Sequence, residues 1–395
     1  MMRIENLRLK DFRNVSDGRF SFDSERVLLL GPNGAGKSNL LEAISFLSVL
    51  RSFRGAPARE MVKLERREFV VAAKVDCGAR KKLLTVRENV GGARELFEDR
   101  MPVRRSSEFI RNFRTVSFAP EDRMIVSGGA SFRRRFFDML ISVLEPRYFA
   151  ELGNCNRALK QRNRALRNGG AGAEYFVPEL VKSAVSLMAF RREYAALVER
   201  EVNRLLNGNG KFAVKCRFSA PEDETAFAEL LIREREKELR RGTTLYGPHL
   251  DDFEFALDRR PLRSCGSTGQ IRLLSLFLRL AEFSLVKRLS DLPVLVLADD
   301  VTGELDADNA RRFFELTEMA DQAFFTFAVD PGSDFFARAQ RLVLGAAACA
   351  RQSRTDGEPA FVKIRQFGYI FRIHHGVETV CVPVPAAGES ALPGT

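Results

Sequence analysis

The sequence predicts an α/β protein whose sheet-forming parts flank a mainly helical insertion. Three observations carry this prediction. The apolar segment Val27–Leu30 runs into a glycine-rich loop and then into a helical pattern, residues 130 to 241 show helical spacing over most of their length, and the apolar run Val294–Ala298 ends in two carboxylates. Buried strands that alternate with helices are typical of α/β proteins.

The chain has 395 residues, which exceeds one ordinary core and indicates about two domains. Hydrophobic residues make up 45% and charged residues 29%, as in soluble globular proteins. We expect a cytoplasmic protein without a membrane partner, because no apolar run is long enough to cross a bilayer and residues 1 to 7 lack the apolar core of a signal peptide. The six cysteines form no C-x-x-C pair, so we expect reduced buried thiols.

The elements follow the chain in three blocks. Residues 68–76 and 82–88 alternate like antiparallel strands, with a Gly-Gly turn at 91–92. Helical patterns then cover 133–144, 148–167, 178–206 and 222–241, separated by glycine-rich breaks. A strand is expected at 253–257, a helix at 270–287, the buried strand at 294–298, a helix from 307 and a strand at 323–328.

A glycine-rich loop with the sequence Gly-Pro-Asn-Gly-Ala-Gly-Lys-Ser occupies residues 31–38, between the strand and the helical pattern. Glycines let consecutive backbone N–H groups turn inward around phosphates, and the helix N-terminus adds a favourable dipole. In this motif the lysine reaches the terminal phosphates and the last hydroxyl holds Mg²⁺. We therefore predict an ATP site, with Mg²⁺ as a second cofactor, formed by Gly31, Pro32, Asn33, Gly34, Ala35, Gly36, Lys37, Ser38 and Asn39.

Asp299 and Asp300 follow the apolar strand directly. A strand that ends in carboxylates beside a phosphate loop brings negative charge to the Mg²⁺ site. We predict that Ser38 and Asp299 are the metal ligands, Asp299 through a bound water, and that Asp300 orients the attacking water as general base. Lys37, Asp299 and Asp300 are thus the predicted catalytic residues. Without the phosphate loop, a strand ending in a solvated acidic turn would explain the pattern as well.

The segment Ser267-Thr-Gly-Gln opens the helical pattern that extends to Lys287. A serine and a glycine at a helix N-terminus form an anion-binding device. Since one nucleotide needs only one phosphate cradle from each chain, we interpret Ser267, Gly269 and Gln270 as a contact to the nucleotide of a second copy. Taken alone, an ordinary helix cap would be the simpler interpretation.

Positive charge is concentrated in one part of the chain. The formal net charge is +11, and residues 101–170 hold 14 Lys and Arg against 6 Asp and Glu, an excess of +8. Such a segment favours contact with DNA phosphates. Within it, the run Arg133, Arg134, Arg135 either contacts DNA or forms a solvated helix face that pairs with acids such as Asp138.

The three motifs together resemble the head of an ABC-type ATPase, and Glu304-Leu-Asp306 looks like its D-loop. The chain is further similar to the RecF family, bacterial recombinational repair proteins of the SMC/Rad50-like branch. The matching segments stand in the family's order and are Leu7–Asn14, Phe118–Asp122, Gly128–Asp138, Leu159–Asn163, Leu245–His249 and Asp299–Asp306.

The resemblance implies an α/β fold in which an ABC-type P-loop ATPase head carries an inserted, mainly helical arm domain. Residues 1–125 and 243–345 would form the head, the latter with the signature and Walker B motifs, 126–242 the arm (lobe II), and 346–395 a divergent C-terminal segment and tail. It also implies that Arg13 and Asp306 contact the nucleotide. The chain departs from the family at Thr268 and Leu250.

For function, the resemblance implies that ATP joins two chains into a homodimer on double-stranded, gapped or single-stranded DNA, and that slow, DNA-stimulated hydrolysis releases it. Recombinational repair, replication-fork recovery, recombinase loading at single-strand gaps with RecR- and RecO-type partners, and a link to the SOS response would follow. The alternatives are a nucleotide-gated DNA-binding scaffold with negligible ATPase activity, another SMC/Rad50-like ABC ATPase, a nuclease-fused ATPase and a transporter subunit. Few C-terminal residues and no switch histidine after Phe324–Ala328 oppose the last two.

Overall fold

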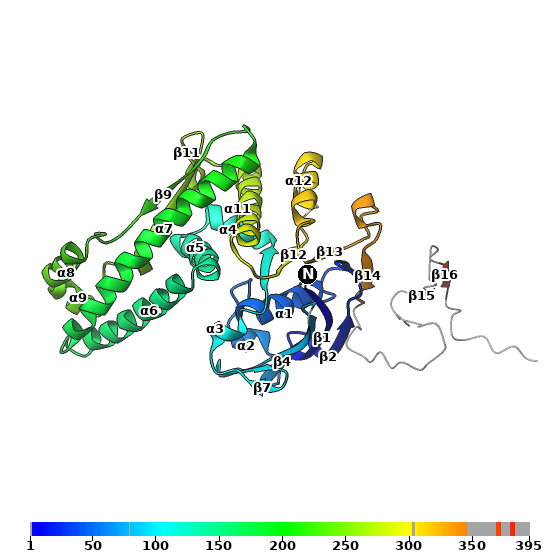
Figure 1. The fold of residues 1–395 in the computed structure, drawn as a ribbon, viewed down its shortest axis with the longest axis horizontal. Coiled ribbons are helices and arrows are strands. Elements are labelled where there is room, and N and C mark those ends of the chain that lie inside the picture. The colour runs from blue at the N-terminus through cyan, green and yellow to red at the C-terminus, as the bar shows by residue number, and fades with distance from the viewer. Residues whose placement is uncertain (1, 79, 302–304, 346–368, 373–379, 384–395) are drawn as a thin grey trace, which may run out of the picture.

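The computed structural model describes residues 2–78, 80–301, 305–345, 369–372 and 380–383. Figure 1 shows two parts, a body that contains the larger sheets and an arm of long helices that extends away from it. We call these parts the head and the arm. In the part of the chain that is described, no helix is both long and apolar enough to span a bilayer.

The centre of the head is a parallel sheet in the order β14-β3-β13-β12-β8. Its strands are β3 (Arg26–Leu30), β8 (Arg114–Phe118), β12 (Val294–Asp299), β13 (Gln322–Phe327) and β14 (Gln340–Val343). Every residue of β12 is buried, as a parallel strand covered on both faces requires. The strands expected at 27–30, 294–298 and 323–328 are confirmed, whereas β8 and β14 were not anticipated.

The two faces of this sheet belong to two hydrophobic cores. Leu295 and Leu297 point into the core shared with helix α1 (Lys37–Val49), while Val296 and Ala298 point into the core shared with helix α11 (Thr268–Leu289). Alternate residues of a strand face opposite sides, so the side chains of β12 contribute to the cores on both faces of the sheet. The phosphate loop and the Walker B carboxylates are thereby fixed at the same edge of the sheet.

An antiparallel sheet covers α1 from the other side, in the order β2-β1-β4-β5-β6-β7. The expected strands 68–76 and 82–88 are confirmed as neighbours in this sheet. The elements are β1 (Arg3–Phe12), β2 (Val15–Ser21), β4 (Glu68–Asp76), β5 (Lys81–Asn89), β6 (Arg94–Glu98) and β7 (Met101–Pro102), with the short helices α2 (Ala58–Met61) and α3 (Ser106–Phe109).

The arm is built on helices α6 and α7, which lie side by side in Figure 1. A small sheet in the order β11-β10-β9 packs at its base. The elements of this part are η1 (Pro120–Asp122), α4 (Arg123–Ser127), α5 (Ala130–Leu144), α6 (Pro146–Arg167), η2 (Ala173–Phe176), α7 (Val177–Leu206), β9 (Phe212–Arg217), α8 (Glu224–Arg233), α9 (Arg235–Arg241), η3 (Pro248–Leu250), β10 (Asp252–Leu257), β11 (Arg260–Pro261) and α10 (Leu262–Cys265).

The single helix expected over 222–241 is wrong, because the chain forms two helices that meet at Glu234. The second helix carries Glu238, which is fully buried and accepts a 2.6 Å hydrogen bond from Arg162 of α6. A buried charge needs such a partner, and the turn between α8 and α9 brings Glu238 onto α6. Tertiary pairing therefore overrides the continuous helical pattern.

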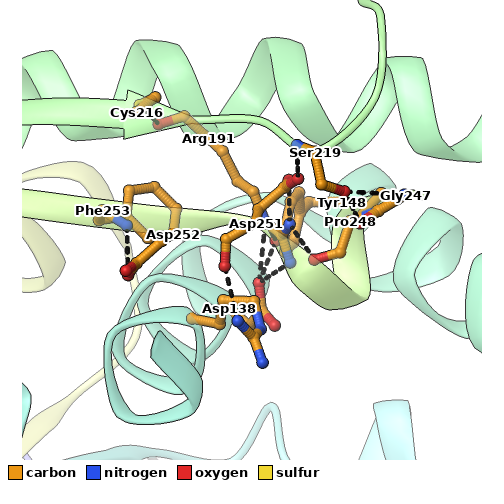
Figure 2. A network of polar contacts seen from close by, with 11 residues as sticks. Asp138, Tyr148, Arg191, Cys216, Ser219, Gly247, Pro248, Asp251, Asp252 and Phe253 are labelled. Atoms are coloured by element: carbon orange, nitrogen blue, oxygen red, sulfur yellow. Dashed lines mark hydrogen bonds and ion pairs between the residues drawn. The ribbon is translucent and has the colours of Figure 1, made fainter. Parts of the chain in front are cut away.

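A second buried network joins the arm to the base of the small sheet. Arg191 of α7 is only 2% exposed and donates to the Asp251 carboxylate at 2.7 Å, to the Pro248 carbonyl at 2.8 Å and to the Asp138 carboxylate of α5 at 2.9 Å. Figure 2 shows these groups converging on the guanidinium, with Tyr148 hydrogen-bonded to Asp138. The arginine thus ties α5 and α7 to the segment that leads into β10.

A carboxylate also links α7 to α11. Glu201 accepts hydrogen bonds from Ser284 at 2.6 Å and from Arg204 at 2.7 Å. Burial raises the pKa of the Glu201 carboxyl, but these hydrogen bonds and the positive charges outweigh it, so its pKa lies below the ordinary value. Glu201 is therefore ionised and stabilising near neutral pH.

The remaining elements follow β12. They are helix α12 (Ala307–Thr317), η5 (Asp334–Phe336), β15 (Tyr369–Arg372) and β16 (Val380–Pro383). Most of the segment 346–395, including the predicted tail, lies outside the described residues. The domain boundaries at 125 and 242 stay predictions.

Candidate nucleotide site

The phosphate loop lies between β3 and α1, as the sequence predicted. Gly34 and Gly36 have φ angles of 82° and 91°, which a residue with a side chain rarely adopts. A Cβ atom at Gly31 would clash with the carbonyl oxygen of Leu344. The glycines therefore allow a tight backbone curve at the N-terminus of α1, where N–H groups and the helix dipole favour an anion.

Lys37 lies inside this curve. Its Nζ donates hydrogen bonds to the carbonyl oxygens of Gly31 at 2.7 Å and Pro32 at 3.0 Å. Burial lowers the pKa of the Lys37 ammonium, and the negative charges of Asp299 and Asp300 act in the opposite direction. The loop thus holds a cation at the position where the terminal phosphates of a nucleotide would lie.

Asp299, at the carboxyl end of β12, lies beside the phosphate loop that follows the carboxyl end of β3. The residue is buried, with 5% of its surface exposed. Its carboxylate accepts hydrogen bonds from the hydroxyls of Ser38 at 2.7 Å and Thr326 at 2.9 Å. A hydroxyl and a carboxylate this close, open to a phosphate site, are ligands that Mg²⁺ uses together with nucleotide oxygens and water. The donor set fits the predicted metal, with Ser38 and Asp299 as the residues that would hold it.

Asp300 follows in the left-handed region, with a φ of 52°. Its backbone N–H donates to the Thr326 hydroxyl at 2.9 Å, so Thr326 fixes both acids at once. This strained turn points the exposed Asp300 away from the strand. Thr326 lies on β13, the strand next to β12. No motif or fixed spacing in the sequence links it to the two aspartates.

These residues line one cavity of about 300 Å³. Most of the predicted phosphate-loop residues and both Walker B acids are brought together there. The lining consists of Asn33, Gly34, Gly36, Lys37, Ser38, Asn39, Arg54, Asp299, Asp300, Thr326 and Ala328.

Arg54 is a cavity residue that the sequence prediction missed. It lies in the loop after α1, and its guanidinium is 3.4 Å from the Asp299 carboxylate and 3.4 Å from the side-chain oxygen of Asn39. A cation here faces the same space as Lys37, which suits a polyanionic ligand. The helix ends at Val49 and Arg51 is nearer to that end than Arg54, so the sequence alone does not single out Arg54.

The structure places Arg13 elsewhere. Its guanidinium binds both oxygens of the buried Glu42 carboxylate, at 2.8 and 2.7 Å, and donates to the Glu60 carbonyl at 2.7 Å. Arg13 does not line the nucleotide cavity. In this structure Arg13 forms an ion pair that anchors α1, and its implied contact with the nucleotide stays a prediction.

The predicted signature residues lie apart from this cavity. Ser267 caps α11 by accepting from the Gln270 N–H at 3.2 Å, and the Gln270 side chain accepts from the Ser267 N–H at 3.0 Å. These residues and Gly269 are exposed. Asp306 caps α12 in the same way, accepting from the Asn309 N–H at 2.8 Å. Glu304, from the predicted D-loop, lies outside the described residues.

The prediction that the three arginines of α5 contact DNA is wrong for Arg133 and unsupported for its neighbours. Arg133 is 3% exposed and binds the Asp252 carboxylate at 2.7 and 3.1 Å. Arg134 donates to the Asp251 carbonyl at 2.6 Å, and Arg135 donates to the Ser52 carbonyl at 2.6 Å. The alternative of a solvated face does not hold for the buried Arg133, whereas Arg134 and Arg135 are half-buried and the Asp138 charge acts on Arg134.

The fold and site define an α/β P-loop ATPase of the ABC type, with a helical arm inserted into the head. Residues 3–347 match the family described as RecF/RecN/SMC N terminal domain. The chain is 33% identical over 351 residues to the DNA replication and repair protein RecF of Acidothermus cellulolyticus, covering 83% of this chain and 94% of that protein. The RecF of Geobacter sulfurreducens is 33% identical over 339 residues, with coverages of 82% and 92%.

Among solved structures, one described as the recombination mediator protein RecF with ATP in the RecFOR pathway superimposes with a TM-score of 0.78. It is 28% identical in sequence, and the match covers 84% of this chain and 94% of that one. The chain belongs to the RecF family. The expected fold class and the family resemblance are confirmed.

Proposed function

We propose that two copies of this chain close on ATP and hold DNA, and that ATP hydrolysis releases it, during recombinational repair and replication-fork recovery. The observation that carries the proposal is the meeting of Lys37, Ser38 and Asp299 at one cavity. Relatives named DNA replication and repair protein RecF support the repair role. The solved RecF–ATP complex supports ATP as the nucleotide.

Each residue has a defined part in this reaction. Lys37 exchanges its two carbonyl acceptors for phosphate oxygens, which a flexible ammonium does at little cost. Ser38 and Asp299 hold Mg²⁺, which when bound neutralises charge on the terminal phosphates. Asp300 accepts a hydrogen bond from the attacking water and receives its proton. Arg54, held 3.4 Å from the Asp299 carboxylate, adds positive charge to the cavity wall that the terminal phosphates would face.

A second copy completes the site in this proposal. Ser267, Gly269 and Gln270 are exposed at the N-terminus of α11 and do not line the cavity of their own chain. An exposed helix N-terminus is suited to a phosphate presented by another subunit. Asp306 would approach the same interface from the start of α12. Slow, DNA-stimulated turnover follows if closure on DNA limits the rate.

DNA contact is assigned to an exposed stripe on α6 in place of the inward-facing arginines of α5. Arg157, Lys160, Arg164 and Arg167 are exposed and recur every three or four residues, which places them on one helix face. In the described residues, no ion pair joins them to an acidic side chain. We further propose a cytoplasmic protein that loads recombinase at single-strand gaps with RecR- and RecO-type partners, a function to which the RecFOR pathway of the solved relative points.

A mixing experiment tests the shared site. Lys37→Ala removes the lysine of the phosphate loop, and Ser267→Arg blocks access of a nucleotide to the N-terminus of the signature helix. Each variant alone should therefore not hydrolyse ATP. Mixed equally on DNA, they should recover about a quarter of the wild-type rate per chain, because half the dimers are mixed and each holds one intact site. A mixture as inactive as its components would contradict the shared site, and an inactive wild type would contradict hydrolysis itself.

A scaffold that binds ATP without useful turnover is the alternative. The paired acids Asp299 and Asp300 at the cavity favour hydrolysis over this alternative.

A further inference from the structure

The turn Ser52–Gly55 carries Arg54 and touches the arm. The Ser52 carbonyl accepts two hydrogen bonds, from the Gly55 N–H at 3.1 Å and from the Arg135 guanidinium of α5 at 2.6 Å. Gly55 has a φ of 80°, and a Cβ atom there would come within 2.9 Å of the Arg135 Nη1. The positive φ favours glycine at this position, and the Arg135 guanidinium lies directly against it.

The opposite side of the turn is tied to the phosphate-loop helix. The Ser52 hydroxyl donates to the Glu42 carboxylate of α1 and accepts from the Arg54 N–H at 3.1 Å. Glu42 is itself held by Arg13. The Arg54 side chain thus projects from a turn that is held on two sides, by Glu42 of α1 and by Arg135 of α5.

Arg54 lines two cavities. It lines the nucleotide cavity and a second cavity of about 80 Å³, whose walls include Phe53 and Arg135. The position of the Arg54 guanidinium beside Asp299 therefore depends on how the Ser52–Gly55 turn is held.

Helix α5, which holds Arg135, is tied to other elements of the arm by ion pairs. Arg133 binds Asp252, and Asp138 binds Arg191 in the network of Figure 2. These buried charge-assisted bonds make α5 move with α7 and the small sheet. Any displacement of the arm by a bound partner then acts on the Ser52 carbonyl through Arg135.

Arg135 is suited to a contact that forms and breaks. Its guanidinium donates to a neutral carbonyl, not to a carboxylate, so the bond is weaker than the ion pairs of Arg133 and Arg191. Burial and the nearby cations Arg279 and Arg51 lower the pKa of the Arg135 guanidinium.

We propose that Arg135 is a positioning residue for ATP hydrolysis, which fixes the Ser52–Gly55 turn, sets Arg54 at Asp299 and transmits DNA binding on the arm to the nucleotide site. The inference rests on the proposed ATPase function and extends it by naming the connection between the two parts.

The test compares Arg135→Gln, Arg135→Lys, Arg54→Gln and the double variant Arg54→Gln/Arg135→Gln with wild type. Arg19→Gln is the matched control, since Arg19 is an exposed arginine on β2. For each protein we would measure kcat and KM for ATP with and without double-stranded DNA, together with the urea midpoint of unfolding.

Arg135→Gln should lower the DNA-stimulated kcat about tenfold, as expected for a misplaced catalytic-site group, with KM changed less than about twofold. Arg135→Lys should recover part of the loss. The double variant should be no slower than Arg54→Gln, because Arg135 acts through Arg54.

Three results would overturn the inference. The first is a wild-type kcat and DNA stimulation in Arg135→Gln while Arg54→Gln is impaired. The second is a double variant in which the two losses multiply. The third is a lower urea midpoint with unchanged kcat per folded chain, which would show a purely structural role. A wild-type protein without ATPase activity would instead refute the proposed function.

Discussion

Replacing Arg13 with alanine discriminates between the role that family resemblance implies and the role that the structure shows. The guanidinium forms a bidentate pair with Glu42, whose side chain is 0% exposed while that of Arg13 is 19% exposed. Arg13→Ala leaves a buried carboxylate that keeps the hydrogen bond from the Ser52 hydroxyl but has lost its ion pair. Breaking a buried ion pair costs about 3–5 kcal/mol, and partial exposure of Arg13 favours the lower end, about 3 kcal/mol.

The assay is urea unfolding followed by circular dichroism, combined with titration of a fluorescent ATP analogue at low urea. The unfolding free energy should fall by about 3 kcal/mol, while ATP affinity per folded chain stays within about twofold of wild type. Glu42→Gln in the Arg13→Ala background should restore part of the stability, because it removes the unpaired charge. If the variant kept wild-type stability but bound ATP about tenfold more weakly, the structural assignment would be refuted and a direct contact of Arg13 with the nucleotide would be supported.

Three further predictions concern hydrolysis, DNA binding and pH. Asp300→Asn should bind ATP normally but hydrolyse it about 100-fold more slowly in a single-turnover assay, and a smaller loss than tenfold would argue against general-base action. Replacing both Lys160 and Arg164 with glutamine should reduce the slope of log K for DNA against log salt by about 2, with Arg19→Gln as the unchanged control. Glu201→Gln should destabilise the protein at pH 7. Because the folded pKa of Glu201 lies below the unfolded value, the difference in urea midpoint should shrink once the pH falls below the unfolded pKa and vanish below the folded pKa, and a constant difference would contradict this.

The parts of the site that could be predicted are those encoded by local sequence. The phosphate loop needs particular residues at consecutive positions. Strand β12 can be recognised in the sequence as an apolar run that ends in Asp299 and Asp300. Both were predicted and both lie at the cavity. Thr326 and Arg54 were not, because their positions depend on which strands and loops the sheet brings together rather than on spacing.

The errors share one physical cause. Arg133 was expected at the surface because charge is costly to bury, but a carboxylate 119 positions away compensates that cost. The continuous helix expected over 222–241 breaks so that Glu238 can meet Arg162. Long-range ion pairs cannot be recognised from the local pattern, and in this protein they determine how the helices and the small sheet of the arm pack together.

Sedimentation velocity of the chain with double-stranded DNA, with and without ATP and Mg²⁺, tests the central claim of an ATP-gated dimer most directly. Asp300→Asn prolongs the ATP-bound state and Lys37→Ala prevents it, so the two variants bracket the wild type. We predict dimers on DNA only with ATP, most abundant for Asp300→Asn and absent for Lys37→Ala. The same monomeric, DNA-bound species with and without ATP in all three proteins would contradict the account.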